Sequence, residues 1–599
     1  MDESTIKLIK SSKIFSSLNA HTYQKILPKF EKIELNKDEI LFSQGDTAKY
    51  LYILLNGKLA VYVSPAYMAH KVVTYIEPGE TIGEMSLLSN EPRSFTVIAA
   101  KHSCLLRLPK KIFTTICKQY PEIMVTMLER SQETIRIFTT EKFKRHIIII
   151  AAHPTISLND FSIQLCRQTK KLATVIFLSD YAMEGDTNKK TQSELQEIIT
   201  EIEKSRAPKR RIIYLLKSTE TTLAKICLKK ADSIYIAAHH DSDVKIDSKI
   251  IAKIKLRKKH LCTDPGLILL YPANTELPKN TRRWFGLMDF SMHHHIRQSN
   301  LSDHLRLLRF IRNCAVGLVL GGGGTRGWAH IGAIKALQEA KIPIDIIGGT
   351  SVGGIIGALY AMHSTHKEIY KQFDEIVMGS GKTVAWKNIT WPYISLFDAK
   401  GFTLSQENAF GDIHLEDLWI PFFCISSNLS LQREEVHRTG LLWEIIRCST
   451  SIPGLVPPMI LNGEIHFDGG LVNNLPVDVM RRQLGKISKI IAIELVRDNG
   501  HEIKYHFPPI LTLSEAILTK IGLGGKKYKY PPFIDTILKA FLMGSIVKAK
   551  QSAPIANLFI NMDLSKYSIL HSDNKQAEEM VQIGFESAVD AIKNFKKKP

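Results

Sequence analysis

The sequence predicts a multidomain protein that begins with a small β-barrel or roll and continues with two α/β domains. The 599 residues are too many for one hydrophobic core. Short alternating strands punctuated by glycine fill the first part, whereas apolar strands alternate with helices further on. We expect four segments, residues 1–140, 141–312, 313–500 and 501–599, the last being a mostly helical extension of the third.

The N-terminal segment has the pattern of an all-β domain. Its expected strands lie in ELNKDEILFSQGD, YLYILLNGKLAVYV, HKVVTYIEPGE and SFTVIAAKHSCLLRL. Helical stretches flank them at KSSKIFSSLNAHTYQKI and KIFTTICKQYPEIMVTMLERSQETIRIF. Short strands of this spacing favour a barrel or roll with helices at its ends.

The second segment alternates strands and helices. The apolar runs HIIIIAAH, ATVIFLSD, RRIIYLLK and ADSIYIAAHH predict strands of a parallel sheet, because such strands are buried on both faces. No phosphate-binding loop follows these strands, so we interpret the domain as a structural spacer or transmission element. Its histidine runs, 239–240 and 293–295, lack metal-ligand spacing, so we expect solvated loops there and no metal site.

Composition limits the class of partner. Lys and Arg number 79 against 59 Asp and Glu, a net charge of +20, which favours anionic partners. The eight cysteines are scattered without a CxxC pair, which is typical of reduced thiols. No signal peptide or run of about 20 apolar residues is present. We therefore expect a cytoplasmic protein, peripheral where it meets a membrane surface.

Two further features bear on partners. A DNA-binding regulator is one alternative, but it predicts a helix-turn-helix after the barrel, where HIIIIAAH stands instead; nucleic acid is not an expected partner. Residues 526–533, KKYKYPPF, precede IDTILKAFLMGSIVKAK, which is amphipathic. Such a segment is typical either of a headgroup interface or of a helix packed on its own domain.

The third segment opens with a glycine-rich turn. The strand AVGLVL is followed by GGGGTRG, residues 321–327, and by the helical run WAHIGAIKALQEA. Clustered amides at a helix N-terminus stabilise negative charge, whether of a phosphate or of an oxyanion. An oxidoreductase using this turn for a dinucleotide needs an acidic residue at the end of the next strand, where Gly349-Thr350-Ser351 stands instead.

That next strand leads into a nucleophile elbow. IDIIGG is followed by Gly349-Thr350-Ser351-Val352-Gly353 and then by the helix GIIGALYAM. In such a turn a strained backbone projects the serine hydroxyl, and small residues such as Gly349 and Gly353 let strand and helix pack closely. Serine also needs a base to accept its proton.

The residues alone leave the base open. Asp468 directly follows the short strand EIHF, but it lies 117 residues beyond Ser351. A conventional triad requires a histidine, for which the candidates are His330, His437 and His466. We expect all three to be structural, His330 as a core residue of a helix and His466 facing away from Asp468 or into solvent.

The three motifs together resemble the patatin-like phospholipases. GLVLGGGGTRGWAHIGAIKAL, IIGGTSVGGIIGALYAM, CSTSIPGLVPPM and HFDGGLVNNLPVDV are similar to the neuropathy target esterase branch of that family. The resemblance implies a hydrolase of phospholipids or lysophospholipids that needs no cofactor, with Ser351 as nucleophile and Asp468 as base. It also implies an oxyanion hole assisted by Arg326 and built from backbone amides of Gly322, Gly323, Gly324, Thr325, Arg326 and Gly327. A scaffold protein with a vestigial site remains an alternative, although all three motifs are whole.

The barrel carries a second resemblance. Gly83-Glu84 and Pro92-Arg93-Ser94 resemble the phosphate-binding cassette of cyclic nucleotide-binding domains. This implies Glu84 on the ribose hydroxyl, Arg93 and Ser94 on the cyclic phosphate, and Gly83 close to the ligand. Ser94 leaves the choice between cAMP and cGMP open, with a slight preference for cAMP. Control of the hydrolase by that nucleotide is a further hypothesis, as is a barrel that serves only as a scaffold.

Overall fold

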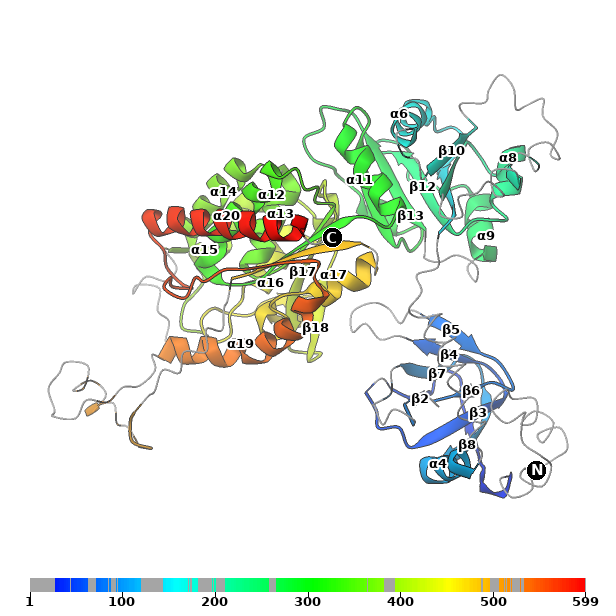
Figure 1. Cartoon of the computed structure of the whole chain (residues 1–599), viewed down its shortest axis with the longest axis horizontal. Helices are drawn as coiled ribbons and strands as arrows, with labels where there is room; N and C mark the ends of the chain where they lie inside the picture. Colours follow the sequence, from blue (N-terminus) through cyan, green and yellow to red (C-terminus); the bar gives the residue numbers. More distant parts are fainter. Residues whose placement is uncertain are drawn as a thin grey trace. The chain divides into compact units, whose positions relative to one another are not determined.

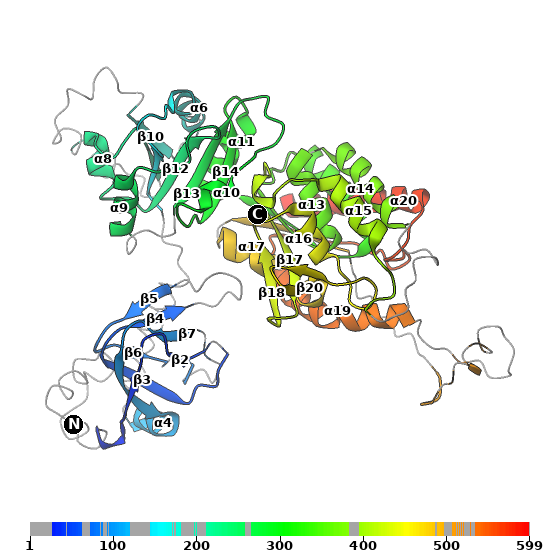
Figure 2. The same cartoon turned by 180° about the vertical axis from the view of Figure 1, so that it is seen from behind.

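The computed structural model of the chain contains two compact units, Met1–Lys142 and Phe143–Pro599 (Figures 1 and 2). The description covers residues 27–43, 45–62, 72–83, 86–87, 93, 95–119, 144–170, 172, 175–180, 197, 199–200, 211–257, 265–363, 365–381, 394–485, 488–495, 506–510, 512, 514–515, 517, 519, 528 and 533–597.

The first unit is the expected barrel, built from two four-stranded antiparallel sheets. One sheet has the order β1-β8-β3-β6 and the other β2-β7-β4-β5. The strands are β1 (Glu31–Leu35), β2 (Ile40–Phe42), β3 (Tyr50–Asn56), β4 (Leu59–Tyr62), β5 (Val72–Ile76), β6 (Thr81–Ile82), β7 (Thr96–Ala99) and β8 (Ser103–Pro109). The 3-10 turn η1 (Leu27–Lys29) precedes them, and helix α4 (Lys110–Gln119) follows.

The second unit begins with a six-stranded parallel sheet of order β10-β11-β9-β12-β13-β14. The four expected strands are confirmed as β9 (His146–Ala151), β10 (Val175–Ser179), β11 (Arg211–Leu216) and β12 (Ser233–His239). Two more, β13 (Gly266–Tyr271) and β14 (Met292–Arg297), complete the sheet. The helices are α6 (Asn159–Thr169), α8 (Thr222–Cys227), α9 (Ser248–Arg257), α10 (Arg282–Phe285) and α11 (Leu301–Ile311).

The histidines at 293–295 are not in a loop, contrary to expectation. They form the centre of β14, and His294 and His295 are buried. His295 contacts Thr281 Oγ1 at 3.0 Å through Nε2 and Leu418 O at 2.8 Å through Nδ1. Burial lowers the pKa of His295 to about 4, so the ring is neutral at pH 7 and can serve in a strand core.

The rest of the second unit is built on an eight-stranded mixed sheet of order β19-β20-β17-β16-β15-β21-β22, with β18 also paired to β17. Strands β15, β16, β17, β21 and β22 run parallel, and β18, β19 and β20 form antiparallel pairs. The bounds are β15 (Val316–Leu320), β16 (Ile346–Thr350), β17 (Phe422–Asn428), β18 (Arg433–His437), β19 (Met459–Leu461), β20 (Glu464–Asp468), β21 (Lys489–Glu494) and β22 (Leu558–Asn561).

Helices pack against this sheet, and helices α12, α13, α14 and α20 lie together (Figure 1). The helices are α12 (Trp328–Glu339), α13 (Val352–His363), α14 (His366–Gly381), α15 (Lys400–Phe410), α16 (Leu442–Ser449), α17 (Val477–Leu484), α19 (Phe533–Ser552) and α20 (Asn574–Lys597). Short 3-10 turns are η2 (Gly324–Gly327), η4 (Leu415–Asp417), η5 (Gly469–Leu471) and η6 (Ala553–Ile555).

The C-terminal residues complete the core of this domain. Strand β22 pairs with β21, so the extension adds a strand as well as the expected helices. Helix α20 touches α12 backbone to backbone, since a Cβ on Gly332 would overlap Val581 O and one on Gly584 would overlap Ala329 O. Two glycines thus permit the close packing of the two helices.

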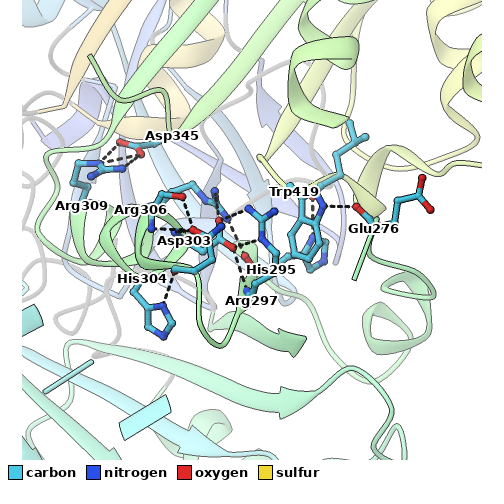
Figure 3. Close-up of polar contacts among 12 residues, drawn as sticks. Glu276, His295, Arg297, Asp303, His304, Arg306, Arg309, Asp345 and Trp419 are labelled. Atoms are coloured by element: carbon cyan, nitrogen blue, oxygen red, sulfur yellow. Dashed lines mark hydrogen bonds and ion pairs between the residues drawn. The ribbon is translucent and has the colours of Figure 1, made fainter. Parts of the chain in front are cut away.

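The two α/β domains of the second unit share a buried polar interface (Figure 3). Trp419, which precedes β17, packs with the core of the first domain and donates from Nε1 to Glu276 O at 2.8 Å. The Arg297 guanidinium lies 4.3 Å above the Trp419 ring and also binds buried Asp303 at 2.8 Å. The first domain therefore holds the segment that leads into β17.

A second contact between the two domains, the ion pair of Arg309 with Asp345, holds the segment that leads into β16. Arg309, in α11, donates from Nη2 and Nε to the Asp345 carboxylate at 2.7 and 2.9 Å (Figure 3). Asp345 is fully buried and also accepts from Val316 N at 2.9 Å. A buried carboxylate needs such partners to offset its desolvation.

Candidate active site

Ser351 lies on a strained turn between β16 and α13. Its φ of 55° is in the left-handed region, where few residues other than glycine lie. The turn is possible because both flanking residues are glycine. A Cβ on Gly349 would overlap Gly353 O, and one on Gly353 would overlap Leu320 O. The Ser351 amide donates to Ser449 Oγ at 2.9 Å, which anchors the turn to helix α16.

Asp468 lies opposite this turn at the end of β20. The register explains the approach: β20 pairs with β17, where Ser426 is opposite Asp468, and β17 pairs with β16. Ser351 Oγ donates to Asp468 Oδ2 at 2.7 Å, and Gly470 N donates to Oδ1 at 2.7 Å. The two residues are only 9% and 2% exposed, respectively.

Burial changes the acidity of this carboxyl. It raises the pKa of Asp468 to about 7, while the hydrogen bonds from Gly470 N and Ser351 partly oppose that rise. Both protonation states are therefore populated near neutral pH, as suits a group that accepts and returns a proton.

The glycine-rich turn lies beside Ser351. A Cβ on Gly322 would overlap Asn474 Oδ1 and would lie 3.1 Å from Ser351 Cβ, so a larger residue requires these side chains to shift. Gly322 N is bonded to Asn474 O at 3.2 Å. Among the described residues, the amides of Gly323 and Gly324 have no acceptor, and Gly324 has a φ of +60°.

Thr325 and Arg326 are turned away from Ser351. Thr325 N donates to Ile569 O at 2.8 Å, and the Arg326 guanidinium donates twice to Tyr567 O, at 2.8 and 3.0 Å. Gly327 packs against Val352, where a Cβ would overlap the valine side chain. These three residues fix the turn to segment 567–569 and to α13.

None of the three candidate histidines contacts the Ser351–Asp468 pair. His330 is buried in α12 as expected, with Nε2 2.8 Å from Gly321 O. The expectation that His466 faces solvent or away from Asp468 is wrong, because residues two apart on a strand share a face and His466 is buried. His466 and His437 share Ser426 Oγ, at 2.9 and 2.7 Å.

Sequence reasoning assigned no role to Ser449 and Asn474. Both lie within recognisable text, CSTSIPG and GLVNNLP, but their contacts join segments far apart in the chain. The Asn474 side chain donates from Nδ2 to Gly322 O at 3.3 Å. Because Gly322 N also donates to Asn474 O, both the amide and the carbonyl of Gly322 are bonded to Asn474.

In the barrel, Arg93 is buried and bonded within the domain. Its Nη1 and Nη2 donate to Gly83 O at 2.7 Å and Tyr50 O at 2.6 Å, and its guanidinium lies 4.2 Å above the Phe42 ring. Gly83 has a φ of +90°, and a Cβ there would overlap Arg93 Nη1. Glu84 and Ser94 lie outside the described residues.

Within the described ranges, no group of three or more His, Cys, Asp or Glu side chains has metal-binding geometry. Within those ranges no helix has both the length and the apolar character needed to cross a membrane.

Family models match three successive parts of the chain. Residues 32–120 match the cyclic nucleotide-binding domain, residues 144–319 the Neuropathy Target Esterase family P-loop like domain, and residues 318–481 the patatin-like phospholipase. These matches confirm both expected resemblances and their order, as well as the fold class.

Individual proteins are similar to parts of this chain. The patatin-like phospholipase domain-containing protein ZK370.4 of Caenorhabditis elegans is 30% identical over 74% of this chain and 37% of its own length. Lysophospholipase NTE1 of Kluyveromyces lactis is 25% identical over 95% of this chain and 48% of its own. The cAMP-bound regulatory domain of Toxoplasma gondii PKA is 26% identical, with a TM-score of 0.19, over 19% of this chain and 46% of that chain. The chain thus spans less than half the length of these curated relatives.

Proposed function

We propose that this chain hydrolyses acyl esters of phospholipids or lysophospholipids at a membrane surface. The premise is its family, since the chain belongs to the neuropathy target esterase branch of the patatin-like phospholipases. The observation that supports a Ser–Asp mechanism is the 2.7 Å hydrogen bond from Ser351 Oγ to Asp468 Oδ2 on a strained turn. No histidine is needed, because the carboxylate itself contacts the nucleophile.

In the first half-reaction Asp468 accepts the Ser351 proton as Oγ attacks the acyl carbonyl carbon. The N-terminus of α13, which begins at Val352, favours the developing negative charge on Oγ. The amides of Gly323 and Gly324 donate to the tetrahedral oxyanion, since no acceptor within the described chain occupies them. The leaving alcohol then takes the proton from Asp468.

This assignment divides the glycine-rich turn by role. Gly323 and Gly324 form the oxyanion hole, whereas Gly322, Thr325, Arg326 and Gly327 hold the turn in place through the contacts described above. Arg326 assists through its charge, because its Nε and Nη2 both donate to Tyr567 O.

Replacement of the nucleophile tests the proposal. We expect Ser351→Ala to lose both hydrolysis of a lysophospholipid and labelling by a fluorophosphonate probe, while Ser302→Ala, an exposed serine in α11, keeps both. A panel of phospholipid and lysophospholipid classes, followed by mass spectrometry of released fatty acid, defines the substrate. Labelling that persists in Ser351→Ala would contradict the mechanism.

We also propose that a cyclic nucleotide, cAMP before cGMP, binds the barrel and regulates the hydrolase. In the proposed complex Arg93, whose Nη1 and Nη2 donate to Gly83 O and Tyr50 O in this structure, donates to a phosphate oxygen, a charge-assisted bond that is stronger than a neutral one. Calorimetry with cAMP and cGMP, beside lipid hydrolysis at saturating nucleotide, tests this. Absence of binding heat with both cAMP and cGMP would refute nucleotide binding. Binding without a change in the rate of lipid hydrolysis would refute regulation.

A further inference from the structure

Asn474 lies where the nucleophile turn, the glycine-rich turn and the loop after Asp468 meet. A Cβ on Gly322 would overlap Asn474 Oδ1 and would lie 3.1 Å from Ser351 Cβ. A Cβ on Gly470 would lie 3.2 Å from Asn474 Oδ1 and 3.1 Å from Asp468 Oδ1. The carboxamide oxygen therefore lies beside Gly322 and Gly470, which border Ser351 and Asp468 respectively.

The orientation of the Asn474 carboxamide is set by one bond. Nδ2 donates to Gly322 O at 3.3 Å, which turns Oδ1 to the other side. No described residue donates to Oδ1, although the side chain is only 3% exposed. A buried amide oxygen without a described donor is suited to bind a water molecule.

We propose that Asn474 is a further catalytic residue, which holds the water that hydrolyses the acyl-enzyme. This inference rests on the proposed serine esterase function. After acylation Ser351 carries the acyl group and no longer donates to Asp468, which frees Oδ2 for a new donor. One water proton is donated to Asp468 and the other to Asn474 Oδ1, and the water oxygen faces the acyl carbonyl carbon.

The step balances without another reactant. The water oxygen bonds to the acyl carbon and its proton passes to Asp468. The bond from Ser351 Oγ to that carbon breaks, and Asp468 returns the proton to Oγ. The products are the free fatty acid and the starting enzyme.

A purely structural role for Asn474 makes a different prediction. The oxyanion hole serves acylation and deacylation alike, so a residue that only holds Gly322 slows both when it is replaced. A residue that holds the attacking water slows deacylation alone, because water is absent from the acylation step. The ratio of the two rates therefore separates the two roles.

The experiment measures both half-reactions on the full chain. Rapid mixing with p-nitrophenyl butyrate gives a burst of p-nitrophenol during acylation and a slower steady rate during deacylation, and intact-protein mass spectrometry detects butyryl-enzyme. We expect Asn474→Ala to slow acylation a few-fold, through loss of the bond to Gly322 O, and to lose about 10²-fold in deacylation, as misplaced groups do. Butyryl-Ser351 should then accumulate.

Two variants complete the test. Asn474→Asp keeps an acceptor oxygen but cannot donate to Gly322 O, so we expect slower acylation without accumulation of butyryl-enzyme. Asn473→Ala is the matched control from the same loop, since its Nδ2 contacts Glu434 and Asp478; it should not accumulate butyryl-enzyme.

Equal loss of both rates in Asn474→Ala would overturn the inference. Accumulation of more butyryl-enzyme than in the wild type by Asn474→Asp or Asn473→Ala would overturn it as well. If Asn474→Ala fails to fold, which absent fluorophosphonate labelling and an altered circular dichroism spectrum would reveal, the same two rates are measured on Asn474→Leu. That variant has a similar volume and also lacks the acceptor oxygen, so the same criterion applies to it. A wild-type chain that never forms butyryl-Ser351 would refute the proposed function itself, a result distinct from the others.

Discussion

Replacement of Asp468 by Asn should abolish activity and stabilise the fold. The carboxyl is 2% exposed, and burial raises its pKa from 3.8 to about 7. In the unfolded chain the group returns to its ordinary pKa and releases its proton above pH 4. Between pH 4 and 7 the folded state therefore binds more protons than the unfolded state, and stability falls as the pH rises.

The magnitude follows from the same two values. The pKa of about 7 exceeds 3.8 by about 3 units, and at about 1.4 kcal/mol per unit the buried carboxylate costs about 4 kcal/mol above pH 7. Asn has the same shape, can accept from Gly470 N and does not ionise. Asp468→Asn should therefore gain up to about 4 kcal/mol over wild type at pH 8, and little at pH 4.

Urea unfolding followed by tryptophan fluorescence measures this difference. All six tryptophans lie between residues 284 and 443, so the signal reports on the second unit and is silent on the barrel. Comparison of the two chains at pH 4, 6 and 8 provides its own control, because every other titrating group is common to both and cancels in the difference. A difference that is constant with pH, or an Asp468→Asn chain less stable than wild type at pH 8, would refute the reasoning.

Two further variants test how the site is supported. Gly324→Ala places a Cβ onto Ile569 O at a φ of +60°, so it should displace the turn and lower kcat on the order of 10²-fold. The control Gly411→Ala has a φ of +49° and open space around its Cβ, so it should cost about 1–2 kcal/mol by urea unfolding and keep its kcat. Equal kcat values for the two variants would count against the steric explanation. Arg309→Met leaves Asp345 buried without its cation and should cost about 3–5 kcal/mol in the same unfolding assay. The double variant Arg309→Met/Asp345→Asn should recover part of that loss. The control Arg433→Met removes a more exposed ion pair and should cost no more than about 1 kcal/mol. A similar cost for both arginine variants would contradict a stabilising role of the Arg309–Asp345 pair.

The predictable parts of the fold were those encoded locally. The turn around Ser351 depends on five consecutive residues, and its small flanking glycines are visible in the sequence. Strands β9 to β12 were predictable because continuous apolar runs are typical of parallel strands. By contrast, β14 reads MHHHIR, and only tertiary burial beneath a neighbouring domain makes its histidines part of a core.

The parts that resisted prediction are contacts across long stretches of chain. Asp468 is brought to Ser351 by two successive strand pairings that no local pattern encodes. Asn474 reaches Gly322 across 152 residues, so its place at the site could not be inferred from GLVNNLP. Ser449 similarly gains its role only when α16 packs beneath the turn.

The close packing of α20 on α12 has a consequence for synthesis. Domains fold as units once their chain has emerged from the ribosome, the N-terminal ones first. Strand β22 and helix α20 belong to the hydrolase sheet and its covering layer, so residues 558–597 must be released before that domain can close. The barrel can fold during translation, whereas the sheet that carries Ser351 is complete only once residues 558–597 have been translated and released.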